Sequence, residues 1–144
     1  MPDQRKLAVL VVDDDPGIRR LLSTVLGGAG FEVHEAEDGL AALAILGGLL
    51  PDAIISDLSM PRMSGYELIP VVRRRFPQIP VVVLSGSVEP DVVFPEIGAN
   101  LYLQKGEIRP SELCKRVAEL VQARHPSQTA DQATLAAAAR PDEQ

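Results

Sequence analysis

Acidic side chains follow two apolar segments of strand length, and these acids could do chemistry. Asp13 and Asp14 come directly after the apolar run Leu7–Val12, and Asp57 comes shortly after the run Ala53–Ile55. Open α/β sheets bind their ligands outside the carboxyl ends of their strands. Clustered carboxylates repel one another unless a cation lies among them, and Mg²⁺ prefers oxygen ligands of this kind. The sequence therefore predicts a magnesium site made by Asp13, Asp14 and Asp57.

Two later apolar segments also end in polar residues. Ser85 closes the segment 79–84, and Lys105 follows the segment 101–104. All carboxyl ends of a parallel sheet lie at one edge, so we expect both residues to face the acids. An aspartate beside Mg²⁺ can act as a nucleophile toward a phosphoryl group, which gives an aspartyl phosphate. Ser85 and Lys105 would then bind phosphate oxygens, and Gly86 would leave room for the group.

Simpler interpretations exist for each of these residues. Asp13 and Asp14 could be ordinary loop acids, and Lys105 by itself would be a solvated surface lysine. Asp15 is favoured as a helix cap rather than a ligand, because a proline follows it at the first helical position. Three further residues with reactive side chains are interpreted as ordinary surface or packing residues: His34, His125 and Cys114.

The elements that must position these residues alternate between strands and helices. The expected strands are 7–12, 31–36, 53–55, 79–85 and 101–104, and the expected helices begin at residues 16, 39, 64 and 110. This alternation predicts a parallel sheet with helices on both faces, and right-handed crossovers limit it to doubly wound orders. Arg19 and Arg20 fall on the solvent face of the first helix.

Prolines modify two of the helical segments. Pro70 lies inside the pattern of the third helix and is expected to kink it or to shorten its regular part. The segment 86–100 contains Pro90 and Pro95, so it can hold only a short or irregular helix. On the second helix, the apolar spacing predicts an inner face made by four residues, namely Leu40, Leu43, Ala44 and Leu46.

Length and composition limit the class of protein. The 144 residues suffice for one domain, and 46% apolar residues exclude wholesale disorder. No apolar run approaches the roughly 20 residues that span a bilayer, and no signal peptide is recognised at the N-terminus. A net charge of −6 argues against direct nucleic-acid binding, and we expect a cytoplasmic protein. We expect one domain at residues 1–125 and a flexible Ala/Gln-rich tail at 126–144.

Four stretches of the sequence resemble the signature blocks of the response-regulator receiver domain, the phosphoacceptor module of two-component signalling. These are VLVVDDDPGIRRLL, PDAIISDLSMPRMSGYEL, VVVLSGS and GANLYLQKG, and the resemblance covers about residues 5–124. It implies a flavodoxin-like three-layer α/β sandwich. Its doubly wound sheet would have five parallel strands in the order 2-1-3-4-5.

The resemblance also implies how the acids would work. Asp57 would accept a phosphoryl group from the phosphohistidine of a sensor histidine kinase or a phosphotransfer protein. Asp14 and Asp57 would ligate Mg²⁺ together with the backbone carbonyl of Ser59, and Asp13 would act largely through water. The downstream partner would be another protein or an output domain that this chain lacks, and homodimer formation is an open alternative.

Signal output would involve the later strands. By resemblance, Ser85 and Lys105 would grip the phosphoryl group, and Tyr102 would rotate after Ser85 moves inward. The sequence departs from the family pattern at Gly106, where receivers usually have the proline that brings a cis peptide bond after the lysine. It also departs in the interval between Ser85 and Lys105, which is about two residues shorter than usual.

Three hypotheses follow for function. The first is a phosphoaccepting receiver, a signalling protein rather than an enzyme that turns over a substrate. The second is a receiver-like interaction module that no longer switches, suggested by the unusual segment 86–100. The third is a Mg²⁺-dependent phosphohydrolase, which is disfavoured because such enzymes usually carry a second acid two residues after the nucleophile. That position is Ser59 here.

Overall fold

The five apolar segments pair as one parallel sheet in the computed structural model, which describes residues 6–86 and 98–124. The strands are β1 (Ala8–Val12), β2 (Glu32–Ala36), β3 (Ala53–Ser56), β4 (Val81–Ser85) and β5 (Leu101–Gln104). They lie in the order β2-β1-β3-β4-β5, and every neighbouring pair is parallel. The expected fold class and strand order are confirmed.

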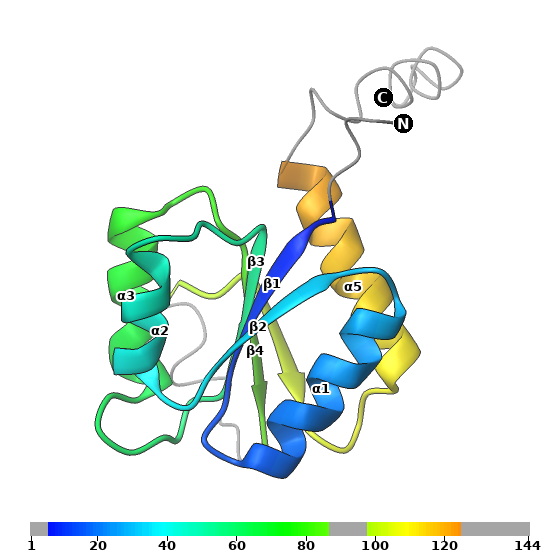
Figure 1. Ribbon diagram of the computed structural model, residues 1–144, viewed down its shortest axis with the longest axis horizontal. Coiled ribbons are helices and arrows are strands. Elements are labelled where there is room, and N and C mark those ends of the chain that lie inside the picture. The colour runs from blue at the N-terminus through cyan, green and yellow to red at the C-terminus, as the bar shows by residue number, and fades with distance from the viewer. Residues whose placement is uncertain (1–5, 87–97, 125–144) are drawn as a thin grey trace.

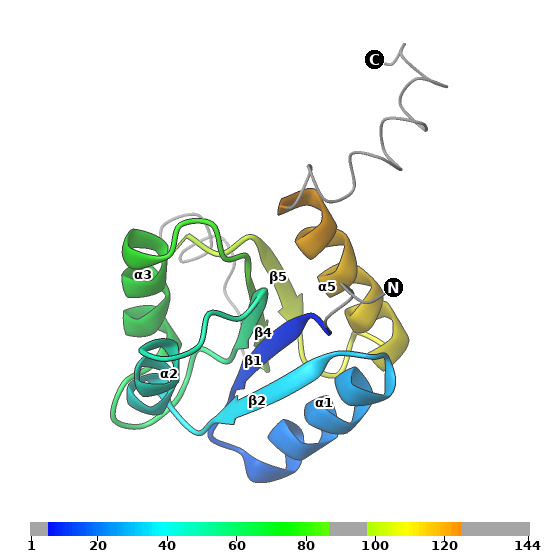
Figure 2. The ribbon, with the colours of Figure 1, turned by 45° about the horizontal axis from the view of Figure 1, so that its top comes forward.

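Helices cover both faces of this sheet. They are α1 (Pro16–Gly28), α2 (Gly39–Leu46), α3 (Gly65–Arg75) and α5 (Pro110–Arg124). Figure 1 shows α2 and α3 on one face and α1 and α5 on the other, and Figure 2 shows the same three layers from a turned view. Successive strand residues therefore enter different cores: Leu10 and Val12 pack toward α2 and α3, whereas Val9 and Val11 pack toward α1 and α5. Two covered faces explain why the central strands are apolar throughout.

Side-chain caps start three of the helices at the edge where the strands end. The Asp15 carboxylate accepts hydrogen bonds from the N–H groups of Gly17 and Ile18 at the start of α1. Asp38 caps α2, and Ser64 caps α3 in a reciprocal capping box with Glu67. Such caps satisfy N–H groups that have no partner within the helix. They also fix the ends of the loops that carry the candidate site residues.

The inner face of α2 differs from the prediction. Leu40 is 54% exposed and Ala44 is exposed as well, whereas Ala42 is fully buried. Leu46 is buried as expected. Apolar spacing cannot select the buried face here, because α2 consists of apolar residues and one glycine all the way round. The face is decided by the way the helix packs on the sheet.

The proline-containing segments are described only in part. Pro70 lies inside α3, and the helix continues past it to Arg75. The predicted short or irregular helix falls mainly on residues 87–97, which lie outside the described residues. The predicted tail at 126–144 lies outside them too. In the part of the chain that the structure describes, no helix has the length and apolar character needed to cross a membrane.

Candidate functional site

The order of the sheet brings the acids of two loops together. β1 pairs with β3, and the N–H of Asp57 donates to the carbonyl oxygen of Val12 at 2.9 Å. Asp13 and Asp14 therefore leave β1 beside the point where Asp57 leaves β3. One carboxylate oxygen from each of the three acids lies within 4.8 Å of the others. The predicted acidic cluster is present in the fold.

Lys105 reaches this cluster from the edge strand β5. Its Nζ lies 2.8 Å from Oδ2 of Asp13 and 3.1 Å from Oδ2 of Asp57. The backbone N–H of Lys105 donates to the carbonyl oxygen of Ser85 at 2.8 Å, which holds the residue beside the end of β4. The structure thus confirms the predicted proximity of Lys105 to the acids.

Backbone hydrogen bonds orient both buried carboxylates. Oδ1 of Asp57 accepts the N–H of Leu58 at 2.7 Å, and Oδ1 of Asp13 accepts the N–H of Asp15 at 2.9 Å. In each case the second oxygen, Oδ2, is the one next to the Lys105 ammonium. The local fold therefore decides which oxygen of each acid faces the site.

Two acids of the cluster are buried, which strengthens the electrostatic interactions among the charged groups. Asp13 is 2% exposed and Asp57 is 7% exposed, whereas Asp14 is exposed to solvent. Burial raises the pKa of Asp13, and the nearby charge of Asp57 raises it further, although hydrogen bonds from Lys105 and Asp15 act against this. Burial would lower the pKa of Lys105, but its hydrogen bonds to Asp13 and Asp57 more than reverse that effect and raise it.

The donor set fits a hard dication. The cluster has three carboxylates, and the ammonium of Lys105 contacts two of them, so the cluster carries excess negative charge. Its ligand atoms are all oxygens, and Mg²⁺ typically binds one or two carboxylates together with water molecules. The residues at this edge of the sheet therefore suit a magnesium ion.

Three other predicted site residues lie in or next to strands β3, β4 and β5. Ser85 ends β4 and is 2% exposed, and Ser59 lies exposed two residues after Asp57. Tyr102 lies half-buried in β5 and packs against the core on the side of α2 and α3. Burial raises the pKa of Tyr102, and Tyr66 adds a smaller contribution. None of the peptide bonds within the described residues is cis, so the bond before Gly106 is trans.

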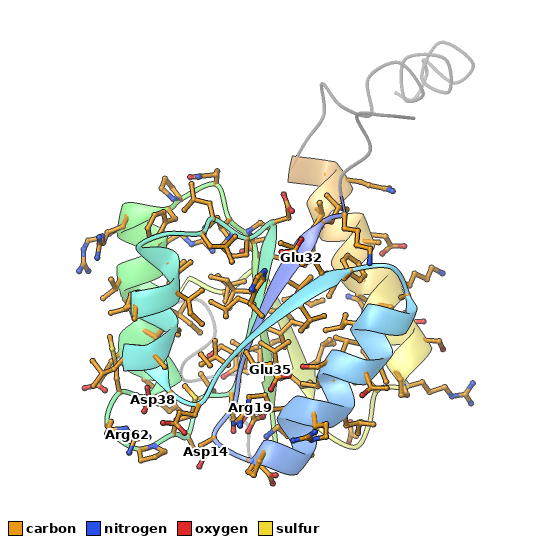
Figure 3. The ribbon with its side chains drawn as sticks, in the orientation of Figure 1. Asp14, Arg19, Glu32, Glu35, Asp38 and Arg62 are labelled. Atoms are coloured by element: carbon orange, nitrogen blue, oxygen red, sulfur yellow. The ribbon has the colours of Figure 1, made fainter. Side chains whose placement is uncertain are left out.

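Arg19 has a role at the site that the sequence did not reveal. The helical pattern places it on the solvent face of α1, but its side chain is only 20% exposed. Its Nη1 donates to the carbonyl oxygen of Asp13 at 2.7 Å, and its Nε donates to Glu35 at 3.0 Å (Figure 3). A backbone acceptor leaves no signal in the side-chain pattern, so nothing in the sequence distinguishes Arg19 from Arg20.

Arg62 and Asp38 form a second arrangement that spacing did not predict. Nε of Arg62 donates to Oδ2 of Asp38, which joins the loop after β3 to the start of α2. Figure 3 labels both residues of this pair, which lie at the edge where the strands end. The two residues are 24 positions apart, and only the packing of the two loops brings them together.

Comparisons with known proteins agree with this geometry. Residues 9–118 match the response regulator receiver domain family. The DNA-binding response regulator MtrA of Mycolicibacterium smegmatis is 38% identical over 117 residues, which make up 80% of this chain and 50% of that protein. The chain spans about half the length of the curated relatives it matches.

Solved structures show the same likeness. The chemotaxis response regulator CheY4 of Vibrio cholerae superposes with a TM-score of 0.74 at 34% identity, covering 81% of this chain and 99% of that one. The response regulator TrrA of Thermotoga maritima, in complex with Mg²⁺ and BeF, superposes with a TM-score of 0.73 at 31% identity. That match covers 79% of this chain and 98% of the other.

Proposed function

The chain belongs to the response regulator receiver domain family, and from this premise we propose that Asp57 accepts a phosphoryl group from the phosphohistidine of a sensor histidine kinase or a phosphotransfer protein. The family is a signalling module rather than a class of enzyme. The observation that carries the proposal is the meeting of Asp13, Asp14 and Asp57 with Lys105 at the carboxyl edge of the sheet.

In this proposal the acids and Ser59 would hold Mg²⁺. Asp14 and Asp57 would act as direct ligands with the backbone carbonyl of Ser59, and Asp13 would act largely through water. The three clustered carboxylates support this assignment, and so does the likeness to TrrA, whose structure is a complex with Mg²⁺ and BeF. When bound, Mg²⁺ would offset the negative charge of the phosphoryl oxygens during transfer.

The chain's own residues prepare Asp57 for the transfer. A carboxylate oxygen of Asp57 would attack phosphorus and form a P–O bond, while the P–N bond breaks and its electron pair stays on the imidazole nitrogen. The Leu58 N–H holds the carboxylate in one orientation. The Lys105 ammonium, already 3.1 Å from Oδ2, would stabilise the charge on the transferred group.

Phosphorylation would then bias the fold toward a second arrangement. The group adds roughly −1.5 to −2 of charge and three acceptor oxygens. Lys105 and Ser85 would bind those oxygens, and Tyr102 would follow Ser85 inward. The output would be a change in binding to a downstream protein, an output domain beyond this chain or a second copy. The alternative is a non-switching module that has the same site but no such response.

The extent and location of this unit belong to the same proposal. We infer that residues 1–125 form the receiver and that 126–144 follow it as a tail. The family match at 9–118 and the end of α5 at Arg124 support this division. A cytoplasmic location fits a phosphoryl donor of the histidine kinase type.

Mass measurement of the intact protein tests phosphoryl acceptance. Incubation with acetyl phosphate and Mg²⁺ should add one phosphoryl mass to the wild type and none to Asp57→Asn. Asp15→Asn is the matched control, because asparagine also caps a helix and Asp15 is assigned no ligand role. A chelator should suppress the modification. Equal modification of the wild type and Asp57→Asn would refute the proposal, and sustained hydrolysis of a phosphate ester would favour the phosphohydrolase.

A further inference from the structure

The loop at residues 57–64, which joins β3 to α3, is tightly closed at its base. The N–H of Gly65 donates to the carbonyl oxygen of Leu58 at 2.9 Å. A Cβ atom at Gly65 would lie 2.2 Å from the carbonyl oxygen of Asp57, so only glycine fits there without a backbone shift. This loop carries Ser59, whose carbonyl is the proposed backbone ligand. Its base is therefore held independently of any ion.

The outer side of the same loop is fastened to the start of α2. Nε of Arg62 donates to Oδ2 of Asp38, and the N–H of Gly39 donates to the carbonyl oxygen of Met63 at 2.9 Å. A Cβ atom at Gly39 would come within 2.7 Å of the Met63 side chain, which shows how closely the two loops approach. A second contact, from Nη2 of Arg62 to Glu37 at 3.3 Å, lies in solvent.

The unusual backbone conformation of Arg62 indicates that its side chain has a structural role. Arg62 has a φ of 66°, the one positive φ of a non-glycine residue in the described ranges. This left-handed conformation is unfavourable for an L-residue, and it persists where the surroundings impose it. Its side chain is 54% exposed and adds nothing to a core, whereas its partner Asp38 is 3% exposed. The ionic contact is the feature that explains an arginine at this position.

We propose that the Arg62–Asp38 pair is a clasp that positions the Ser59 carbonyl and thereby makes the site selective for Mg²⁺ over Ca²⁺. This inference rests on the proposed function, because it assumes that the acids and Ser59 hold a dication. Mg²⁺ requires a near-ideal octahedron with short bonds, whereas Ca²⁺ accepts longer and less regular ones. A loop fastened on both sides holds its carbonyl in one place, and a loosened loop disfavours the smaller ion. Arg62 is a positioning residue and not a ligand.

Charge alone predicts the opposite result, which makes the clasp testable. Arg62 is a cation on the loop that begins at Asp57, so removing its charge should strengthen the binding of any dication. The clasp predicts instead that Mg²⁺ binding weakens while Ca²⁺ binding does not. Outer contacts that orient ligands typically change metal affinity by about 10- to 100-fold when they are removed.

Calorimetric titration with Mg²⁺ and with Ca²⁺ separates these effects. Arg62→Gln and Asp38→Asn should each bind Mg²⁺ about tenfold more weakly than the wild type, with Ca²⁺ affinity unchanged or higher. Asparagine can keep the cap on Ala41, so Asp38→Asn tests the clasp without removing the start of α2. The controls are Arg20→Gln and Glu119→Gln, which make the same charge changes at exposed positions outside the clasp. Thermal unfolding of each variant shows that it is folded.

Each other outcome overturns the clasp. Mg²⁺ binding to Arg62→Gln as tight as to Arg20→Gln would refute it, and so would a parallel loss of both ions. If the wild type binds no Mg²⁺, or if Asp57→Asn binds as well as the wild type, the proposed function falls and the clasp with it. If Asp57→Asn loses binding while Arg62→Gln and Asp38→Asn keep it, only the clasp is wrong.

Discussion

Lys105 lies between two buried carboxylates, and this position gives it two tasks. Its ammonium offsets part of the charge of Asp13 and Asp57. After phosphoryl transfer the same ammonium would face the new group on Asp57. A buried charge that loses its partner is strongly destabilising, so a lysine that can exchange partners without leaving the site suits both states.

The Asp38 carboxyl links the clasp to stability in acid. The N–H of Ala41 lowers the pKa of Asp38, and Arg62 lowers it further, although burial acts in the opposite direction. A carboxyl with a lowered folded-state pKa stabilises the protein above its ordinary value of 3.8, and this contribution is lost as the pH falls through the folded pKa.

We therefore expect Asp38→Asn to lower the free energy of unfolding at neutral pH. Between about pH 5 and pH 3, the free energy of unfolding of Asp38→Asn should fall less steeply than that of the wild type. The reason is that the variant has no carboxyl at position 38 to take up a proton on unfolding. Urea unfolding at several pH values measures both effects. Arg20→Gln, which removes a charge at an exposed position of α1, is the control. Parallel profiles for Asp38→Asn and the wild type would contradict the prediction.

Among the elements, α3 depends on one side chain at its C-terminal end. Arg73 donates to the carbonyl oxygens of Gly98 and Pro77 at 3.1 and 2.8 Å, and to the side-chain oxygen of Asn100 at 2.8 Å. The same Asn100 oxygen accepts the N–H of Val81 at the start of β4. Arg73 thus joins the end of α3 to the segments that lead into β4 and β5.

Substitution of Arg73 should therefore destabilise the fold. We expect Arg73→Ala to lower the free energy of unfolding by about 2 kcal/mol, since hydrogen bonds to charged groups contribute on this order. Arg74→Ala removes the same side chain from the next, exposed position and should change it by less than about 0.5 kcal/mol. Urea unfolding monitored by circular dichroism distinguishes the two. Equal effects would show that the three contacts of Arg73 add little.

The helices also show when the spacing of apolar residues is enough to predict the buried face. Leu68, Ile69 and Val72 of α3 are fully buried at helical spacing, and the charged residues of the helix leave only this face for the core. In α2 no polar residue marks the solvent side, and the prediction placed Leu40 inside wrongly. The polar residues, more than the apolar ones, made the face of α3 predictable.

The whole molecule is where the proposed switch would act. The site draws on β1, β3, β4 and β5, and Tyr102 lies in β5 against the core beside α2 and α3. A change at Asp57 would therefore affect residues across the sheet without unfolding any element. The non-switching alternative predicts that a phosphoryl mimic such as beryllofluoride binds at the site and that the environment of Tyr102 does not change.

Tyrosine fluorescence can decide between these alternatives. The chain has two tyrosines and no tryptophan, so Tyr66→Phe leaves Tyr102 as the sole fluorescent reporter. Beryllofluoride with Mg²⁺ should change its emission as the ring moves to a different environment, and Asp57→Asn in the same background should abolish the change. Fluorine NMR shows independently that the mimic is bound. Bound mimic with unchanged emission would favour the non-switching module.

The sequence by itself determined the chemistry of the site. Asp13, Asp14, Asp57 and Lys105 each follow a segment of strand length, and parallel strands must end at one edge. Their residue types and places in the chain were therefore enough to predict that they meet, as the structure confirms.

The tertiary structure decided how those residues are held. The bond from Arg19 to the carbonyl of Asp13 and the pairing of Arg62 with Asp38 depend on the directions of three loops. Those directions are set by helix caps, by the close contact at Gly39 and Gly65, and by the packing of α1, α2 and α3. Backbone acceptors and loop directions leave no periodic pattern in a sequence, because they arise only after the sheet has brought distant segments together.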